Sequence, residues 1–466
     1  MNPLSSHIIF SKKGHILASS LVLLLIILIA ISLIVNTILS GKRSEMKSYN
    51  RLKAIYAAES GFEIIKSALL HGDSLTKFNL LKGVEGHLET HVDYTSQLCQ
   101  SLGYITAFSS GNANGQKVKL ISLWGIKDAF WPGNAIVLTG KSANLVLTGC
   151  SKVIGDISLP NGIVRLNNDH SGDSCNGPSL EGQKKELDTT ASFSFPVKDA
   201  VDLCNQYYRY FTGQIRPDKL VQASYVAISP SDDIFNSKYE KIYIEGSMEF
   251  FIHSPIIQAL SIVMVERDLD IRGSTGINGG IFIVGRNVTI SENANIQNVF
   301  IFSRGNILIK DDVHFQGQIL TQGSVKIKDR SVVEYPSSIL SVFKRLSLKD
   351  ERRIELMDSV RYSGSIASIS TNAQNDSIPP LLFKMAPGCQ LTGTLFSNAN
   401  VMLNGSIVGL VVANGLTGEH DNKRYYDWLE NTTVDRKSLP NQFVFPHLFS
   451  GSFRMQEICR NKLWQK

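Results

Sequence analysis

The feature that most constrains this chain is a predominantly apolar run near its N-terminus, from Leu17 to Leu39, with no charged residue, proline or glycine. An α-helix needs about 20 such residues to cross the hydrocarbon core of a bilayer, and it leaves few backbone polar groups unpaired in lipid. A secretory signal peptide, the rival interpretation, has a shorter apolar core of about 7–15 residues before a small-residue cleavage site. We therefore predict a single transmembrane helix.

The helical pattern continues beyond the membrane. Between Glu45 and Leu70 there is no proline, and apolar residues recur at steps of mostly three or four, which places them on one face of a helix. An unbroken helix from Leu17 to Leu70 would be roughly 80 Å long at about 1.5 Å per residue. We expect a transmembrane and stalk helix over residues 15–70; a membrane helix followed by a separate packing helix is the alternative.

Two short segments resemble the N-terminal region of type IV pilin-like proteins. Residues 11–14 (SKKG) are basic and end in glycine before the apolar run, and residues 56–63 (YAAESGFE) are similar to the helix of PilX-type minor pilins and large pseudopilins. The resemblance is confined to the leader and the N-terminal helix. It implies a basic leader over residues 1–14, cut between Gly14 and His15, and a helix that packs against other pilin-like subunits.

The departures from the pilin pattern lie just after the implied cleavage bond. Pilins commonly begin the mature chain with Phe or Met, whereas His15 would be the first mature residue here. Major pilins also carry a glutamate where this chain has Ser19. Loss of that glutamate is tolerated in tip-type pseudopilins, so the resemblance implies a minor, tip-located subunit and not a filament-forming one.

The charges that flank the span bear on its orientation. A pilin-like chain keeps its N-terminus in the cytoplasm, whereas the positive-inside rule favours the opposite, because more basic residues follow the span than precede it. Large domains translocate largely regardless of such charges, so we expect an inner-membrane anchor with the C-terminal domain in the periplasm or at the cell surface; a cytoplasmic domain is the alternative. The basic residues after the span are Lys42, Arg43, Lys47, Arg51 and Lys53.

Beyond the helix, short apolar runs alternate with Gly, Asn and Asp, and one stretch repeats. From Ile262 to Tyr335, columns of residues recur at steps of 18 or 19. This period indicates a parallel β-helix or related solenoid, whose stacked units share one core. Segments 135–163 and 391–412 look like further rungs, and an antiparallel sandwich is the alternative. The columns are Val265, Val284, Phe302 and Thr321; Ile271, Ile290, Ile309 and Ile327; and Ile277, Ile296, Phe315 and Val333.

These patterns predict a mainly β protein with a long N-terminal α-helix: a single transmembrane helix followed by a β-solenoid domain with a small helical insertion. The insertion is expected at Ser347–Val360 (SLKDERRIELMDSV), which is typical of a short helix. The C-terminal tail is expected to cap the open end of the solenoid. After the leader and helix, we expect a β-rich region with the first rungs at 71–240, solenoid repeats at 241–340, the insertion at 341–385, further rungs at 386–418 and the cap at 419–466.

Composition and cysteine spacing exclude several kinds of site. A net charge of +6 on 466 residues is too weak for the basic surface of a nucleic-acid partner. The cysteines show no CxxC or Cys/His spacing, so no metal site is predicted, and no nucleotide or cofactor motif is present. In an oxidising periplasm we expect one to three disulfides, with Cys150 and Cys175 as the first pair to test; buried free thiols are the alternative. The other cysteines are Cys99, Cys204, Cys389 and Cys459.

Candidate catalytic residues are sparse. Glycoside hydrolysis requires two carboxyl groups at a fixed separation, and the carboxylates that come nearest are Asp268 with Asp270, and Asp311 with Asp312 beside His314. We interpret both groups as solvated turn and outer-face charges and predict no catalytic residue. Aromatic residues would form a glycan- or partner-binding patch if exposed, although such residues more often pack in cores. They are Trp124, Trp131, Tyr425, Tyr426 and Trp428.

The sequence therefore favours a structural subunit and not an enzyme. The preferred hypothesis is a minor pilin-like component of a type IV pilus or a related secretion or uptake machine, acting in assembly or tip adhesion. Its partners would be membrane lipid, other pilin-like subunits, and a surface glycan or protein. One alternative is a membrane-tethered envelope scaffold that resembles bactofilin-type β-helices, with an uncut N-terminus and self-assembly through the solenoid ends. Another is a surface polysaccharide-processing enzyme that loses activity in Asp270→Asn.

Overall fold

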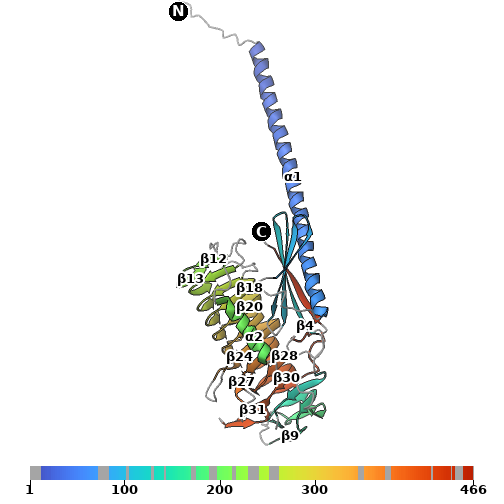
Figure 1. The fold of residues 1–466 in the computed structure, drawn as a ribbon, viewed down its shortest axis with the longest axis vertical. Helices are drawn as coiled ribbons and strands as arrows, with labels where there is room; N and C mark the ends of the chain where they lie inside the picture. Colours follow the sequence, from blue (N-terminus) through green and yellow to red (C-terminus); the bar gives the residue numbers. More distant parts are fainter. Residues whose placement is uncertain are drawn as a thin grey trace, which may run out of the picture.

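The protein consists of a long helix, a five-stranded sheet beside the end of that helix, and a solenoid of stacked strands (Figure 1). Helix α1 (Lys12–His71) is continuous over 60 residues. Its N-terminal half projects away from the rest of the molecule. The computed structural model describes residues 12–71, 83–100, 104–126, 131–140, 143–168, 175–187, 197–211, 217–228, 241–250, 262–344, 351–372, 379–420, 423–441, 443–446 and 455–464.

The C-terminal part of α1 packs against an antiparallel sheet of order β1-β2-β3-β4-β35. Small residues lie beside Phe62 and Ile65 on the helix side of this contact: Ala54, Ala57, Ala58 and Gly61 are all buried. Because these side chains are short, the helix backbone approaches the sheet closely; a Cβ atom at Gly111 would overlap the carbonyl oxygen of Ala54. The strands are β1 (Val84–Glu89), β2 (Val92–Gln100), β3 (Ile105–Ala113), β4 (Gln116–Ile126) and β35 (Met455–Trp464).

The solenoid confirms the expected architecture, because its stacked strands pair in parallel. Its largest sheet has 16 strands, and the solenoid coils so that each turn adds one strand to each face. This sheet contains β5 (Asn134–Leu138), β7 (Lys152–Ile154), β8 (Asp156–Leu159), β10 (Ser179–Glu181), β11 (Lys184–Glu186), β12 (Lys219–Val221), β14 (Lys241–Ile244), β16 (Ile262–Val265), β18 (Gly276–Val284), β20 (Asn295–Ser303), β22 (His314–Thr321), β24 (Val332–Phe343), β26 (Arg361–Ser370), β28 (Cys389–Ser397), β30 (Gly405–Ala413) and β34 (Thr433–Asp435).

A second solenoid sheet has 11 strands, and a third has three. The larger contains β13 (Tyr225–Ile228), β15 (Ser247–Phe250), β17 (Leu269–Ile271), β19 (Val288–Ile290), β21 (Ile307–Ile309), β23 (Val325–Ile327), β25 (Ile354–Leu356), β27 (Leu381–Met385), β29 (Asn400–Met402), β31 (Gly415–His420) and β32 (Lys423–Tyr426). The smaller contains β33 (Trp428–Glu430), β6 (Leu145–Thr148) and β9 (Val164–Asn167).

Two of the three predicted columns match the strand register throughout: Ile271, Ile290, Ile309 and Ile327 are successive partners, and so are Ile277, Ile296, Phe315 and Val333. The third is wrong at one rung, where Ser303 and not Phe302 pairs with Thr321. The register shifts between Ile296 and Val299, where Asn298 has a φ of 55°. This is the extra residue of a β-bulge, which moves later partners by one position.

An asparagine ladder stabilises one corner of the stacked rungs. Each side-chain oxygen accepts a hydrogen bond from the backbone N–H one rung along: Asp268 from Asn287 at 3.0 Å, Asn287 from Asn306 at 2.9 Å, and Asn306 from Ser324 at 2.9 Å. The corner N–H groups, which the sheets leave without a ladder partner, are satisfied in this way.

The rungs are not stacked in chain order. Rungs formed by residues 131–187 lie at one end of the solenoid, and the later series runs from β12 at the other end back toward them. Strand β30 pairs with β5, and β34 pairs with β7, which joins the last rungs of the series to the first rungs of the chain. The solenoid therefore closes only when segments about 280 residues apart meet, as the backbone pair Val412 and Val137 shows.

The outward face of the 16-stranded sheet is apolar and covered. Helix α2 (Val197–Tyr208) lies across it, and the ring of Tyr207 is 4.9 Å from that of Phe300 and 5.4 Å from that of Phe302. Phe108 of β3 and Ile121 of β4 belong to the same buried cluster. The five-stranded sheet is thus packed between α1 on one face and the solenoid on the other.

Two expectations are wrong. The helix expected within Ser347–Val360 is absent from the described part, residues 351–360, where β25 forms a rung; the adjacent β26 and β27 are rungs too. Pairing with neighbouring rungs outweighs the weak local helix preference. The tail expected to cap the solenoid at 419–466 instead supplies β32, β33 and β34 to its sheets and sends β35 to the edge of the sheet beside α1. The helical element that accompanies the solenoid is α2.

We predict that Gly61→Ala destabilises the protein, whereas Gly41→Ala does not. A Cβ atom at Gly61 would overlap the hydroxyls of Ser96 and Ser109, while nothing lies within 4 Å of one at Gly41. Overpacking costs about 1–3 kcal/mol and the gain in helix propensity returns about 1 kcal/mol. Thermal unfolding of both variants in detergent tests this; equal melting temperatures would show that the close helix–sheet contact is not needed.

Candidate functional site

The exposed half of α1 is the first candidate. The segment Ser19–Ala68 is long and apolar enough to cross a membrane, and no other helix in the described ranges meets that test. Leu21 is 65% exposed and Leu39 is 45% exposed. Because so large an exposed apolar surface is unfavourable in water, this half of the helix requires an apolar environment.

A stripe of exposed apolar residues continues along α1 past the predicted span. We call Met46, Tyr49, Leu52 and Tyr56 the outer stripe; their side chains are 67%, 58%, 46% and 58% exposed. Their spacing of three or four places Tyr49, Leu52 and Tyr56 on the helix face opposite the buried alanines. One face of the helix is therefore used inside the molecule, and the opposite face presents apolar surface outward.

Polar contacts fasten the flanks of α1 to the edges of the sheet. Lys53 Nζ lies 2.6 Å from Glu89 Oε2, and Asn114 Nδ2 donates to Asn50 Oδ1 at 3.2 Å. The hydrogen bond with Glu89 raises the pKa of Lys53. Of the basic residues that follow the span, Lys53 thus has an internal partner. These exposed contacts add little stability; the buried packing of α1 on the sheet determines which face forms the outer stripe.

The predicted cleavage bond lies inside the helix. Helix α1 begins at Lys12 and runs through Gly14 and His15 without a break. Residues 1–11 of the predicted leader lie outside the described residues. The predicted boundaries of the span, Leu17 and Leu39, both fall within α1. Cleavage before His15 stays a prediction.

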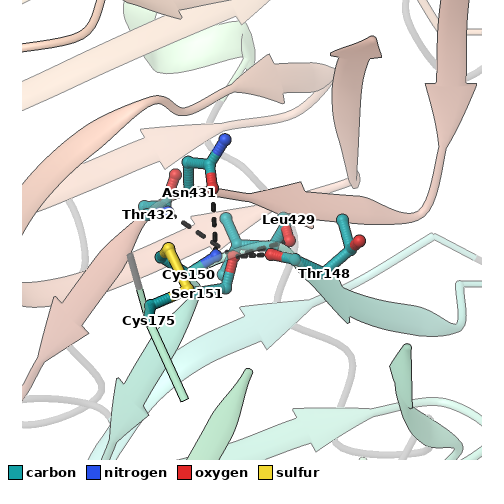
Figure 2. The surroundings of a disulfide bond; sticks show 7 residues. All are labelled: Thr148, Cys150, Ser151, Cys175, Leu429, Asn431 and Thr432. Carbon is teal, nitrogen blue, oxygen red and sulfur yellow. Dashed lines mark hydrogen bonds between the residues drawn. A yellow bond between two sulfur atoms is a disulfide. The ribbon is translucent and has the colours of Figure 1, made fainter. Parts of the chain in front are cut away.

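The solenoid end farthest from the N-terminus is the second candidate (Figure 1). We call this the distal end; it consists of β6, β7 and β8 with the outermost strands β9, β10 and β11. The predicted disulfide between Cys150 and Cys175 is confirmed here. Figure 2 shows its surroundings: Cys150 N donates to Asn431 Oδ1 at 3.0 Å, and Ser151 Oγ donates to Thr148 O at 2.7 Å.

The same contacts join early and late segments of the chain. Ser151 Oγ also lies 2.8 Å from Leu429 O, in hydrogen-bond range, and the chain around Asn431 contributes β33 and β34 to these rungs. A disulfide closes a loop and reduces the entropy of the unfolded chain. Its position at the outermost rungs stabilises strands that have a neighbour on one side only. Sequence alone suggested the disulfide, but nothing in it indicated Asn431 as the partner of Cys150.

Two of the remaining cysteines are buried in the described structure. Cys204 on α2 and Cys389 on β28 are buried free thiols. Burial raises the pKa of Cys204 to about 12, so this thiol stays protonated and unreactive at neutral pH. Cys99 and Cys459 lie in one register row three strands apart, which separates them by roughly 14 Å, too far for a disulfide.

The carboxylates considered for catalysis have structural partners. Asp268 belongs to the asparagine ladder, and Asp270 forms an ion pair with Arg272. Asp311 and Asp312 have positive φ angles at a corner between rungs. Asp312 pairs with Arg330 at 2.9 Å, and this hydrogen bond lowers the pKa of its carboxyl group. His314 lies 3.4 Å from Glu334. No cluster of three metal-ligating residues occurs within the described ranges.

The aromatic residues do not form one exposed patch. Trp124 and Trp131 are buried in the cores on either face of the five-stranded sheet. Tyr425 stacks on Trp428 with ring centroids 4.6 Å apart. Tyr426 is 50% exposed. The arrangement favours packing for four of the five residues.

No protein-family model matches the chain, and neither does any curated protein sequence. Among solved structures, the competence-associated pilin ComZ from Thermus thermophilus is 12% identical with a TM-score of 0.23, and the alignment covers 89% of this chain and 97% of that one. An ice-binding protein from an Arctic yeast is 15% identical with a TM-score of 0.18, over 66% of this chain and 92% of that one. At such scores neither likeness carries an argument.

We predict that the double variant Cys150→Ser/Cys175→Ser loses stability at the distal end. The disulfide spans 25 residues, for which loop-closure entropy gives about 3 kcal/mol. Hydrogen exchange is expected to rise in β9 and β10 and to stay unchanged in β20 and β22. A reducing agent should reproduce the effect in the natural protein and have none in the double variant; exchange that rises equally in all rungs would contradict a local role.

Proposed function

We propose that this chain is a minor pilin-like subunit, anchored in the inner membrane, of a type IV pilus or related secretion or uptake machine. The observation that carries the proposal is the two-sided use of α1. Its inner face packs on an antiparallel sheet through small residues, and its outer stripe continues the exposed apolar surface of the span. A helix of this kind suits lateral packing against similar helices, first in lipid and then in a filament.

In this proposal the solenoid is the outer domain. It projects from the sheet along the end of α1, and the distal end lies at the opposite extremity from the N-terminus. The disulfide supports a location beyond the inner membrane, because disulfides persist in oxidising compartments and are rare in the cytosol. The domain would then act in assembly of the machine or in adhesion at its tip.

End-to-end polymerisation through the solenoid is less well supported. The outermost strand β11 carries Lys184 and Lys185, and all three of its residues are exposed. Lysines on an edge strand oppose pairing with another chain. This observation favours the pilin-like proposal over an envelope scaffold that assembles through solenoid ends.

Cleavage of the leader is the first test. When the full-length chain is produced together with a prepilin peptidase, we expect the membrane-bound protein to begin at His15, as N-terminal sequencing or intact mass would show. A Gly14→Leu variant should stay uncut and serves as the control. A chain that keeps Met1 while a co-produced pilin is processed would argue against the proposal.

The outer stripe is the second test. Leu52→Glu places a charge on the stripe, and burying an unpaired charge between helices costs several kcal/mol. We expect cross-linking to other pilin-like subunits in membranes to fall at least about tenfold, with unchanged thermal stability, since Leu52 is 46% exposed. Ser44→Glu, which introduces the same charge on an exposed position off the stripe, is the matched control. Equal cross-linking in both variants would show that the outer stripe takes no part in assembly.

A further inference from the structure

A half-buried arginine lies where the solenoid meets the five-stranded sheet. Arg436 follows β34, and its backbone N–H donates to Ile154 O at 2.8 Å, which attaches the residue to the distal rungs. Phe445 forms a backbone bridge with Ile126, the last residue of β4, at 2.7 and 2.8 Å. The guanidinium of Arg436 lies 5.2 Å above the ring of Phe445. The side chain is therefore held between the two parts of the molecule.

A hollow opens beside this guanidinium. Its volume is about 480 Å³, enough for a small organic ligand. Leu439, Pro440 and Phe443 contribute apolar wall, and Lys437 contributes a second cation. Gly155 lines the hollow with a φ of 130°, and a Cβ atom there would lie 2.8 Å from the Cβ atom of Arg436. The glycine thus provides the space that Arg436 occupies.

The positive charge of Arg436 is not matched by an acid among the described residues. Its Nη1 is buried and has no hydrogen-bond partner there. Asp156, the acidic residue that lines the hollow, is engaged by Lys185 at 2.6 Å and by Gln183 N at 2.9 Å. Asp435 accepts hydrogen bonds from Ser438 N and Oγ at 3.0 and 2.6 Å. Desolvation lowers the pKa of Arg436, which shows the cost of leaving this cation without a counter-charge.

We propose that the Arg436 hollow is a binding site for an oxyanion, a carboxylate or phosphate group carried on a larger ligand. Guanidinium groups bind both oxyanions through paired, charge-assisted hydrogen bonds. Arg436 lines the hollow and supplies the guanidinium, Lys437 adds charge at the rim, and the apolar walls accept the body of the ligand. The site does not depend on the pilin-like function, and its test is separate.

The experiment uses the full-length protein in detergent micelles with small fluorinated probes followed by ¹⁹F NMR. We expect 4-fluorobenzoate to bind and its neutral counterpart 4-fluorobenzamide not to bind. Inorganic phosphate should compete with 4-fluorobenzoate if the site accepts either oxyanion; weak competition by phosphate with strong competition by acetate would identify carboxylates as its ligands. Equal binding of the two fluorinated probes, or no binding of either, would overturn the proposal.

Variants assign the binding to Arg436. Arg436→Gln should weaken 4-fluorobenzoate binding by at least about tenfold, since a hydrogen bond to a charged group contributes this much. Lys437→Gln, at an exposed position, should weaken it by a smaller factor, and Arg165→Gln, on exposed β9, should not change it. Undiminished binding by Arg436→Gln would exclude the site.

Stability gives an independent readout. If Arg436 is a buried cation that awaits its ligand, Arg436→Met removes a desolvation cost and the melting temperature should stay equal or rise. Added phosphate should raise the melting temperature of the natural protein and not that of Arg436→Met. A marked fall in the melting temperature of Arg436→Met would show that Arg436 stabilises the fold without a ligand, for example through its contact with Phe445, and would overturn the proposal.

Discussion

The close contact between the backbone of α1 and the backbone of β3 determines the position of every other part of the molecule. It is possible because alanine and glycine face each other there: a side chain at Gly111 would meet the carbonyl of Ala54, and one at Gly61 would meet two serine hydroxyls. At such short range the helix and sheet have a single good fit. These small residues, together with the buried side chains of Phe62 and Ile65, set the direction of the sheet relative to α1.

The sheet passes this orientation on to the solenoid. One face holds α1, and the other presents Phe108 and Ile121 to the outward columns of the 16-stranded sheet. At the far end of β3 and β4, Tyr104 donates a hydrogen bond to Val444 O at 3.0 Å and packs edge-on against Tyr335. Since each face has a buried apolar cluster, apolar packing joins the helix to the sheet and the sheet to the solenoid at these points. A force applied to the solenoid would be transmitted to α1.

The sequence contained enough information for the helix and the repeat. The apolar run from Leu17 to Leu39 is stable in lipid only as a helix. The columns around Ile290 keep a period that few folds produce. The local pattern could not give the bulge at Asn298, because one inserted residue leaves the apolar spacing nearly unchanged. Similarly, Ile354–Leu356 forms a strand of three residues, too short to produce a recognisable alternation among charged neighbours.

Partners far apart in the chain were not predictable from patterns. No pattern in the segment Met455–Trp464 predicts that it pairs with β4, because the sequence of an edge strand does not indicate which strand it pairs with. Likewise, the resemblance of residues 56–63 to pilin helices did not show that their small side chains form the helix–sheet contact. Arg436 gave no signal in the sequence, since its lack of an acidic partner among the described residues arises only in the folded chain. Which strands pair, and which charged side chains lack a counter-charge, are determined only in the folded chain.

The stacking of late rungs onto early ones has a consequence for biogenesis. If the C-terminal domain crosses the inner membrane as proposed, residues 131–187 emerge well before residues 405–435. Until then β5, β6 and β7 each have an early neighbour on one edge and lack the late strands β30, β33 and β34 on the other. During translocation these edges are open to incorrect pairing with other emerging chains. The Cys150–Cys175 bond lies within the early segment and can form before the late strands arrive. An early covalent closure of that kind would hold the waiting rungs in shape, which makes oxidative folding a step that precedes completion of the solenoid.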